Sequence, residues 1–135
     1  MAVRLGVSEA VDGARGNMTS LCLVIEDEPA IRRLVVLVLQ DLGCEVLEAP
    51  DGETAVSMLS SARPDFVLTD VRLPGIDGVE VTRQIRMEKE LAGTHVLLMS
   101  AFAEPRQHAG DAFLAKPFDI DSLTDFVAPY IDRSG

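Results

Sequence analysis

Apolar residues occur along this chain in short runs that alternate with stretches of helical spacing. The runs have the length of strands and cover residues 21–25, 44–49, 65–69, 96–99 and 112–115, although Glu45 and Glu48 interrupt the second run and Asp65 opens the third. An apolar run without polar alternation is typical of a strand that is covered on both faces. Between the runs, apolar residues recur every three or four positions, beginning near Pro29, after Gly52, at Val79 and near Asp121. We therefore expect strands and helices in alternation.

This alternation predicts an α/β fold with a doubly wound, five-stranded parallel sheet, because each right-handed crossover places a helix on one face of the sheet. The expected strand order is 2-1-3-4-5, the flavodoxin-like arrangement. One crossover is unusual, since only about a dozen residues separate the fourth strand from the fifth, close to the minimum for a parallel connection. This segment also contains Pro105 and Gly110. The fourth helix is therefore predicted to be short or absent, and Pro129 is predicted to kink or stop the last helix.

Length and composition predict one globular domain. The chain has 135 residues, 47% of them hydrophobic, which is enough for a core without disulfides or a structural metal. Residues 1–20 carry three glycines and scattered charge, so we expect a flexible leader there and the domain over residues 21–133. Met18, close to the first strand, is an alternative to Met1 as the natural start.

The net charge limits the classes of partner, and the cysteines indicate the cellular compartment. The net charge of −10 argues against general affinity for nucleic acid or for an anionic membrane surface. The longest apolar runs are far shorter than the roughly 18 residues of a transmembrane helix. Cys22 and Cys44 fall in predicted strands without metal-type spacing, so we expect them to be reduced core residues. The expected location is the cytoplasm.

Polar residues stand where the predicted strands end. Glu26 and Asp27 follow the first strand, Asp70 ends the third, Ser100 the fourth, and Lys116 follows the fifth. The carboxyl ends of parallel strands lie at one edge of a sheet, so these side chains are expected to converge. Neighbouring carboxylates repel one another unless a cation joins them, and Mg²⁺ takes one or two carboxylates while keeping waters that phosphate oxygens can replace. The sequence therefore predicts a magnesium site with room for a phosphoryl group.

Asp70 is the best candidate for a nucleophile at this site. A carboxylate can attack phosphorus and form an aspartyl phosphate when a metal and fixed donors neutralise the developing charge. Asp70 stands alone on its strand, and Pro74, Gly75 and Gly78 predict a turn just beyond it. Lys116 would contact the phosphoryl oxygens as a point charge, and Ser100 would donate one hydrogen bond to them.

Four motifs in this order resemble the receiver domain of two-component response regulators. They are Val24-Ile-Glu-Asp-Glu-Pro29, Leu68-Thr-Asp-Val-Arg-Leu-Pro-Gly-Ile-Asp-Gly78, Met99-Ser-Ala101 and Lys116-Pro-Phe118, and the resemblance covers about Leu21 to Ile131. It implies that Asp70 accepts a phosphoryl group from the phosphohistidine of a histidine kinase or a histidine phosphotransfer protein. It also implies that Asp27 and Asp70 ligate Mg²⁺, with Glu26 acting through a metal-bound water and the backbone carbonyl of Arg72 completing the protein ligands.

The resemblance assigns further roles around the phosphoacceptor. Ser100 becomes the switch hydroxyl, Phe113 the aromatic switch residue and Lys116 the phosphate-binding lysine, with the Lys116–Pro117 peptide bond cis. Arg72 and Phe102 resemble the positions that tune the loss of phosphate, and a bulky Phe102 would restrict the attacking water. The chain departs from the family in two ways: Glu26 replaces the more usual aspartate, and the shortened fourth-helix region predicts a different partner surface.

Two alternatives remain open at this point. A Mg²⁺-dependent phosphoester hydrolase could use the same acids, although Arg72 stands where such an enzyme typically has a second carboxylate. A degenerate receiver could act as a binding module without phosphorylation, against which the intact acids, hydroxyl and lysine argue. In the leading interpretation the chain catalyses only its own phosphotransfer and dephosphorylation and signals to a downstream protein by contact. The kinase, the target and the oligomeric state are left open.

Overall fold

The computed structural model describes residues 19–131, in which five parallel strands form one sheet in the order β2-β1-β3-β4-β5. The strands are β1 (Leu21–Ile25), β2 (Glu45–Ala49), β3 (Phe66–Asp70), β4 (His95–Ser100) and β5 (Ala112–Ala115). The predicted fold class and strand order are confirmed. The strand order reverses at β1, which pairs with β2 on one side and β3 on the other, so the switch point lies between β1 and β3.

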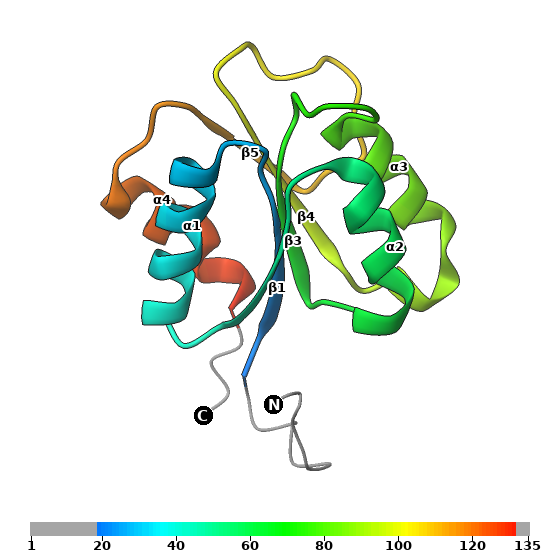
Figure 1. The fold of residues 1–135 in the computed structure, drawn as a ribbon, viewed down its shortest axis with the longest axis horizontal. Coiled ribbons are helices and arrows are strands. Elements are labelled where there is room, and N and C mark those ends of the chain that lie inside the picture. The colour runs from blue at the N-terminus through cyan, green and yellow to red at the C-terminus, as the bar shows by residue number, and fades with distance from the viewer. Residues whose placement is uncertain (1–18, 132–135) are drawn as a thin grey trace.

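Two helices cover each face of the sheet (Figure 1). They are α1 (Pro29–Asp41) and α4 (Ile120–Val127) on one face, and α2 (Gly52–Ala62) and α3 (Gly78–Met87) on the other. Helix α3 ends at Met87 and is followed by a 3₁₀ turn, Lys89–Leu91. Helix α4 likewise gives way to a 3₁₀ turn, Ala128–Tyr130, where Pro129 lacks the amide that a longer α-helix needs.

The segment between β4 and β5, residues 101–111, contains no helix, as the yellow part of the ribbon shows (Figure 1). This confirms the prediction for the short crossover. Instead, the segment is fastened to α3 by Arg86, whose guanidinium donates to the Ala109 carbonyl at 3.0 Å and to the Asp111 carboxylate at 2.8 Å. Without a helix over it, β5 is half-buried and its last residue, Ala115, is exposed.

Alternation along the strands divides the core into two layers. Cys22 and Val24 face α1 and α4, whereas Leu23 and Ile25 face α2 and α3. Both cysteines are buried and free, as predicted, although Cys44 lies one residue before β2 rather than within it. The buried side of α1 consists of Val35, Val36, Val38 and Leu39.

Some of the sequence expectations concern residues outside the range that the structure describes. The predicted leader, residues 1–20, lies outside them except for Thr19 and Ser20, as do the alternative start at Met18 and the last two residues of the predicted domain. Among residues 19–131 there is no helix with the length and apolar character needed to cross a bilayer.

Candidate functional site

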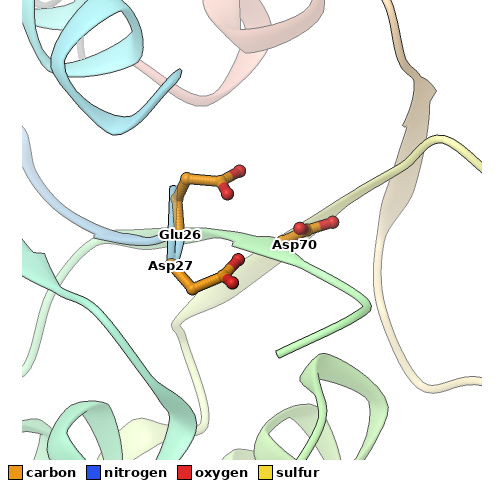
Figure 2. Close-up of side chains that lie close together, drawn as sticks. All are labelled: Glu26, Asp27 and Asp70. Atoms are coloured by element: carbon orange, nitrogen blue, oxygen red, sulfur yellow. The ribbon is translucent and has the colours of Figure 1, made fainter. Parts of the chain in front are cut away.

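Three carboxylates meet at the carboxyl edge of the sheet. Glu26 and Asp27 follow β1, Asp70 ends β3, and a ligand atom from each lies within 4.8 Å of the others (Figure 2). Glu26 and Asp70 are 1% and 7% exposed, whereas Asp27 is open to solvent. Opposite ligands of an octahedral Mg²⁺ lie about 4.2 Å apart. The cluster therefore fits one such ion after a small side-chain adjustment.

Lys116 lies directly against this cluster. Its Nζ donates to Glu26 Oε1 at 2.7 Å and to Asp70 Oδ2 at 3.2 Å, so one ammonium bridges acids from two different strands. The backbone positions it, because its N–H donates to the Ser100 carbonyl at 2.8 Å in continuation of the β4–β5 pairing. The Lys116–Pro117 peptide bond is cis, which is the geometry that the resemblance implies.

The carboxylate of Glu26 is held on both of its oxygens. Oε1 accepts the bond from Lys116, and Oε2 accepts one from the Glu28 backbone N–H at 3.0 Å. The backbone carbonyl of Glu26 accepts a further bond from Arg32 Nη1 at 2.7 Å. With both oxygens engaged, Glu26 is better placed to fix the lysine than to ligate an ion directly, and Asp27 and Asp70 offer the more accessible ligand atoms.

Burial dominates the electrostatics of the site. It raises the pKa of the Glu26 carboxyl above its ordinary value, although Lys116 and the Glu28 amide act in the opposite direction. Burial also raises the pKa of the Asp70 carboxyl, against the influence of Lys116 and with a smaller contribution from the Asp27 charge. Burial alone would lower the pKa of Lys116, but its bonds to Glu26 and Asp70 outweigh this and raise it. The three carboxylates carry more negative charge than one lysine can neutralise. A divalent cation would relieve the repulsion that remains.

The backbone around Asp70 fixes the candidate nucleophile. The Arg72 backbone favours the charged form of the Asp70 carboxyl and so lowers its pKa against the effect of burial, and the Val71 N–H extends the sheet by donating to the Met99 carbonyl at 2.8 Å. Gly78 closes the loop that follows, since its N–H donates to the Val71 carbonyl at 2.8 Å. A Cβ on Gly78 would overlap the backbone carbonyl oxygen of Asp70, so this close approach requires glycine.

The remaining predicted residues lie on β4, on β5 and in the loops after β3 and β4. Ser100 is buried at the end of β4, and its Oγ accepts a hydrogen bond from the Phe102 N–H at 3.0 Å. Phe102 is 59% exposed, and the Arg72 guanidinium lies 4.2 Å from its ring centroid, which is a cation–π contact. Phe113 is half-buried three residues before Lys116 on β5 and packs on the core layer of α2 and α3, not on the acids.

The sequence analysis missed one residue that contacts the loop after Asp70. Glu53, in the first turn of α2, accepts a hydrogen bond from the Ile76 N–H at 3.1 Å. Nothing in its local sequence indicates this contact, because the two residues are 23 positions apart.

The fold and the site define the class of this protein. The protein is an α/β domain with a flavodoxin-like sheet of order 2-1-3-4-5, and an acidic cluster and a lysine meet at the carboxyl ends of its strands. The family described as "Response regulator receiver domain" matches residues 22–128. The chain therefore belongs to the response regulator receiver domain family, as the four motifs suggested.

Relatives of known name agree with this assignment. The chain is 31% identical over 120 residues to sporulation initiation phosphotransferase F of Bacillus subtilis, covering 84% of this chain and 95% of the relative. It is 34% identical over 124 residues to chemotaxis protein CheY-3 of Vibrio cholerae, covering 87% and 95% of the two chains. The structure of response regulator TrrA from Thermotoga maritima in complex with Mg²⁺-BeF matches with a TM-score of 0.75 and 32% identity, over 84% of this chain and all of that one (100%).

Proposed function

We propose that this chain is a phosphorylation switch that accepts a phosphoryl group on Asp70 from a phosphohistidine and signals by protein–protein contact. The observation that carries the proposal is the placement of Lys116 Nζ against both Glu26 and Asp70, beside Asp27. The donor is a histidine kinase or a histidine phosphotransfer protein. A cytoplasmic location belongs to the same proposal, since the described cysteines are free thiols.

The proposed transfer joins an Asp70 carboxylate oxygen to phosphorus while the bond between phosphorus and the donor's imidazole nitrogen breaks. The imidazole nitrogen takes the electron pair of that bond, so the transfer needs no further reactant. Negative charge accumulates on the phosphoryl oxygens, which Lys116 Nζ approaches as a cation and Ser100 Oγ approaches as a hydrogen-bond donor. The Arg72 N–H keeps the Asp70 carboxylate oriented.

The acids would hold Mg²⁺ during this transfer. Asp27 and Asp70 would be its direct ligands, Glu26 would act through a bound water, and the backbone carbonyl of Arg72 would complete the protein ligands. When bound, the ion supplies charge neutralisation for the transferring phosphoryl group. TrrA, at 32% identity, was solved as a Mg²⁺-BeF complex, which supports the same occupant here.

A shallow hollow near Lys116 is the proposed docking surface for the phosphodonor. This hollow has a volume of about 450 Å³ and lies between α1 and the segment after β5. It is lined by Leu34, Phe118, Ile120 and two aspartates. Leu34 and Ile120 are 39% and 55% exposed, and Phe118 lies two residues from Lys116. A helical protein that carries a phosphohistidine would cover these apolar side chains while its imidazole reaches Asp70.

Phosphorylation would be read out through Ser100 and Phe113. When a phosphoryl oxygen attracts the Ser100 hydroxyl, the Ser100 side chain moves toward Asp70, and the half-buried Phe113 ring on the neighbouring strand gains room to reorient. Because residues 101–111 replace a helix, the surface that changes differs from that of relatives with a full fourth helix. A downstream protein that recognises this surface is the proposed target.

Arg72 and Phe102 would set the lifetime of the phosphorylated state. The Arg72 guanidinium lies over the Phe102 ring, and these residues come two positions after Asp70 and Ser100, the last residues of β3 and β4. This stacked pair would obstruct the path of a water molecule that attacks the phosphoryl group. Dephosphorylation is then the only other reaction that the chain itself promotes.

The two alternatives have less support. A phosphoester hydrolase typically needs a second acid near the nucleophile on the same strand end, where this chain has Arg72. A degenerate receiver would lack part of the set, whereas acids, hydroxyl and lysine are all present at the strand ends.

Labelling with acetyl phosphate tests the proposed function. Wild type is expected to gain one phosphoryl group only when Mg²⁺ is present, and Asp70→Asn is expected to gain none. Asp125→Asn, which changes an exposed acid on α4, serves as the matched control and should label as wild type does. Mg²⁺-independent labelling, or equal labelling of Asp70→Asn, would refute the proposal, and turnover of a phosphoester without a stable adduct would favour the hydrolase.

A further inference from the structure

The loop that follows Asp70, residues 71–77, rests on the beginning of α2. Gly52 is so close to it that a Cβ would lie 2.6 Å from Ile76 Cγ1 and 2.7 Å from the Ile76 carbonyl oxygen. The next residue, Glu53, extends its carboxylate to the Ile76 N–H at 3.1 Å. Two consecutive residues of α2 therefore form a seat for the tip of this loop.

Gly75 completes the seat from the side of the loop. Its φ of +73° is a left-handed conformation that glycine adopts without strain, and a Cβ there would overlap both oxygens of the Glu53 carboxylate. Hence the carboxylate lies directly against the backbone of Gly75 while it accepts the bond from Ile76. Within residues 19–131, Glu53 is the only side chain of another helix that is hydrogen-bonded to the backbone of this loop.

The base of the same loop is attached to the phosphorylation site. The Gly78 N–H closes the loop on the Val71 carbonyl, Gly78 lies directly against the Asp70 backbone carbonyl, and the Arg72 backbone favours the charged form of the Asp70 carboxyl. In a short loop that is closed at its base, the position of the tip restricts the backbone at Arg72. A contact made at Ile76 therefore reaches the group that orients Asp70.

We propose that Glu53 is a positioning residue for the phosphorylation site: by holding the tip of the loop at Gly75 and Ile76, it sets the backbone of Arg72 against Asp70. This inference rests on the proposed function, because it assigns a task within that site. Glu53 touches neither the phosphoryl group nor the ion. Its effect on Mg²⁺ binding passes through the loop.

Two conservative variants separate the reach of this side chain from its charge. Glu53→Gln loses the charge but keeps an oxygen at the distance of Ile76, whereas Glu53→Asp keeps the charge but ends one methylene short. Glu53→Ala loses both. Because Glu53 is exposed near the start of α2, all three variants should fold, and thermal unfolding will verify this.

The experiment measures Mg²⁺ affinity by calorimetry and amide hydrogen exchange at Ile76 in the four full-length proteins. Glu53→Asp and Glu53→Ala are expected to speed exchange at Ile76 and to weaken Mg²⁺ binding at least about threefold, since outer contacts of metal sites affect affinity to this degree or more. Glu53→Gln is expected to stay within about twofold of wild type in both measurements, because it retains the acceptor.

The possible negative results distinguish between the role of Glu53 and the proposed function. If Glu53→Ala binds Mg²⁺ as wild type does, or if Ile76 exchange does not change, the positioning role is wrong and the proposed function is unaffected. If Glu53→Gln is as weak as Glu53→Ala, the charge and not the hydrogen bond matters, which also overturns the inference. If wild type itself binds no Mg²⁺, the proposed function fails and the role of Glu53 fails with it.

Discussion

Two neighbouring segments follow the strands that carry the site, and they are held in opposite ways. Residues 71–77, after β3, are closed by backbone hydrogen bonds at Val71 and Gly78 and seated on α2. Residues 101–111, after β4, have no helix and, apart from the backbone bond from the Asp111 N–H to the Val96 carbonyl at 2.7 Å, are held by side chains, among them Arg86 and the pair of His108 with Glu104 at 2.8 Å. In the proposed function, the first segment would position Asp70 for phosphoryl transfer. The second lies where the response would be transmitted.

This difference indicates that the region around Asp70 must keep its geometry, whereas the segment after β4 can vary in shape. The proposed phosphoryl transfer needs the acids, the lysine and the loop backbone to agree to within a fraction of an ångström, and in that region main-chain bonds and required glycines are combined with the side-chain bonds of Lys116 and Glu53. A surface that recognises a partner needs only a distinct shape, so a helix can be replaced by an irregular segment if other contacts cover the sheet. The predictions below test whether the two regions are as independent as this implies.

The largest effect is expected at Lys116. Replacement by alanine removes the cation that approaches the phosphoryl group and should slow labelling by acetyl phosphate about 100-fold or more. It also leaves Glu26 buried without its partner, which should destabilise the fold by about 3 kcal/mol. Lys89→Ala, at the other lysine of the sequence and exposed on the 3₁₀ turn after α3, is the matched control and should change neither value. Equal rates for the two variants would contradict the role of Lys116.

Arg86→Ala should affect the second region alone. It removes the donors to Ala109 and Asp111 and a further bond to the Thr94 carbonyl at 2.8 Å, and it should cost about 2 kcal/mol in the free energy of unfolding. Mg²⁺ affinity is expected to stay constant. The control Arg83→Ala loses only exposed contacts within α3, to Glu80 and to Met87 Sδ, and should change the free energy of unfolding little. A loss of Mg²⁺ affinity in Arg86→Ala would show that the two regions are coupled.

Asp70→Asn should stabilise the protein in the absence of Mg²⁺, because burial opposes the charge on this carboxyl. The folded state binds the Asp70 proton more tightly than the unfolded state, for which the ordinary pKa is 3.8. The advantage of the variant should therefore appear as pH rises above 3.8 and become constant above the raised folded pKa. Added Mg²⁺ should stabilise wild type and not the variant. Denaturant unfolding at several pH values measures this, and a destabilised Asp70→Asn would be the contrary result.

The smallest effect is expected at the contact that joins the two segments. Phe102→Ala removes the ring under the Arg72 guanidinium and should speed dephosphorylation about twofold to fivefold, as expected for loss of an exposed cation–π contact. Phe102→Leu keeps part of the bulk without the aromatic face and should have an intermediate rate. Decay of the phosphorylated protein after removal of the donor gives the rates. An unchanged rate in Phe102→Ala would exclude the role in lifetime.

Local sequence determined much of the fold and of the candidate site. Five apolar runs identify the strands, and the residues that follow them identify Glu26, Asp27, Asp70, Ser100 and Lys116, because parallel strands bring their ends together. The lack of a helix before β5 could be predicted from chain length alone. Each of these inferences uses only spacing along the chain.

Contacts between distant segments could not be predicted in this way. The exposed side chains of Glu53 and Arg86 bond to the Ile76 backbone N–H and to the Asp111 carboxylate, 23 and 25 residues away, and such contacts leave no periodic pattern. Leu34 fits the helical spacing of buried residues but is exposed, since α1 carries apolar residues on more than one face and only tertiary packing selects Val36 and Leu39. The half-buried state of β5 likewise depends on what covers it.

The central claim is that the acids and the lysine form one phosphoryl-transfer site, and a structure with Mg²⁺ and beryllofluoride tests it most directly. The account predicts beryllofluoride on the Asp70 carboxylate, the ion between Asp27 and Asp70, and Lys116 Nζ turned from Glu26 toward a fluoride. Beryllofluoride absent from Asp70 in saturated crystals, or an ion bound away from Asp27 and Asp70, would contradict it.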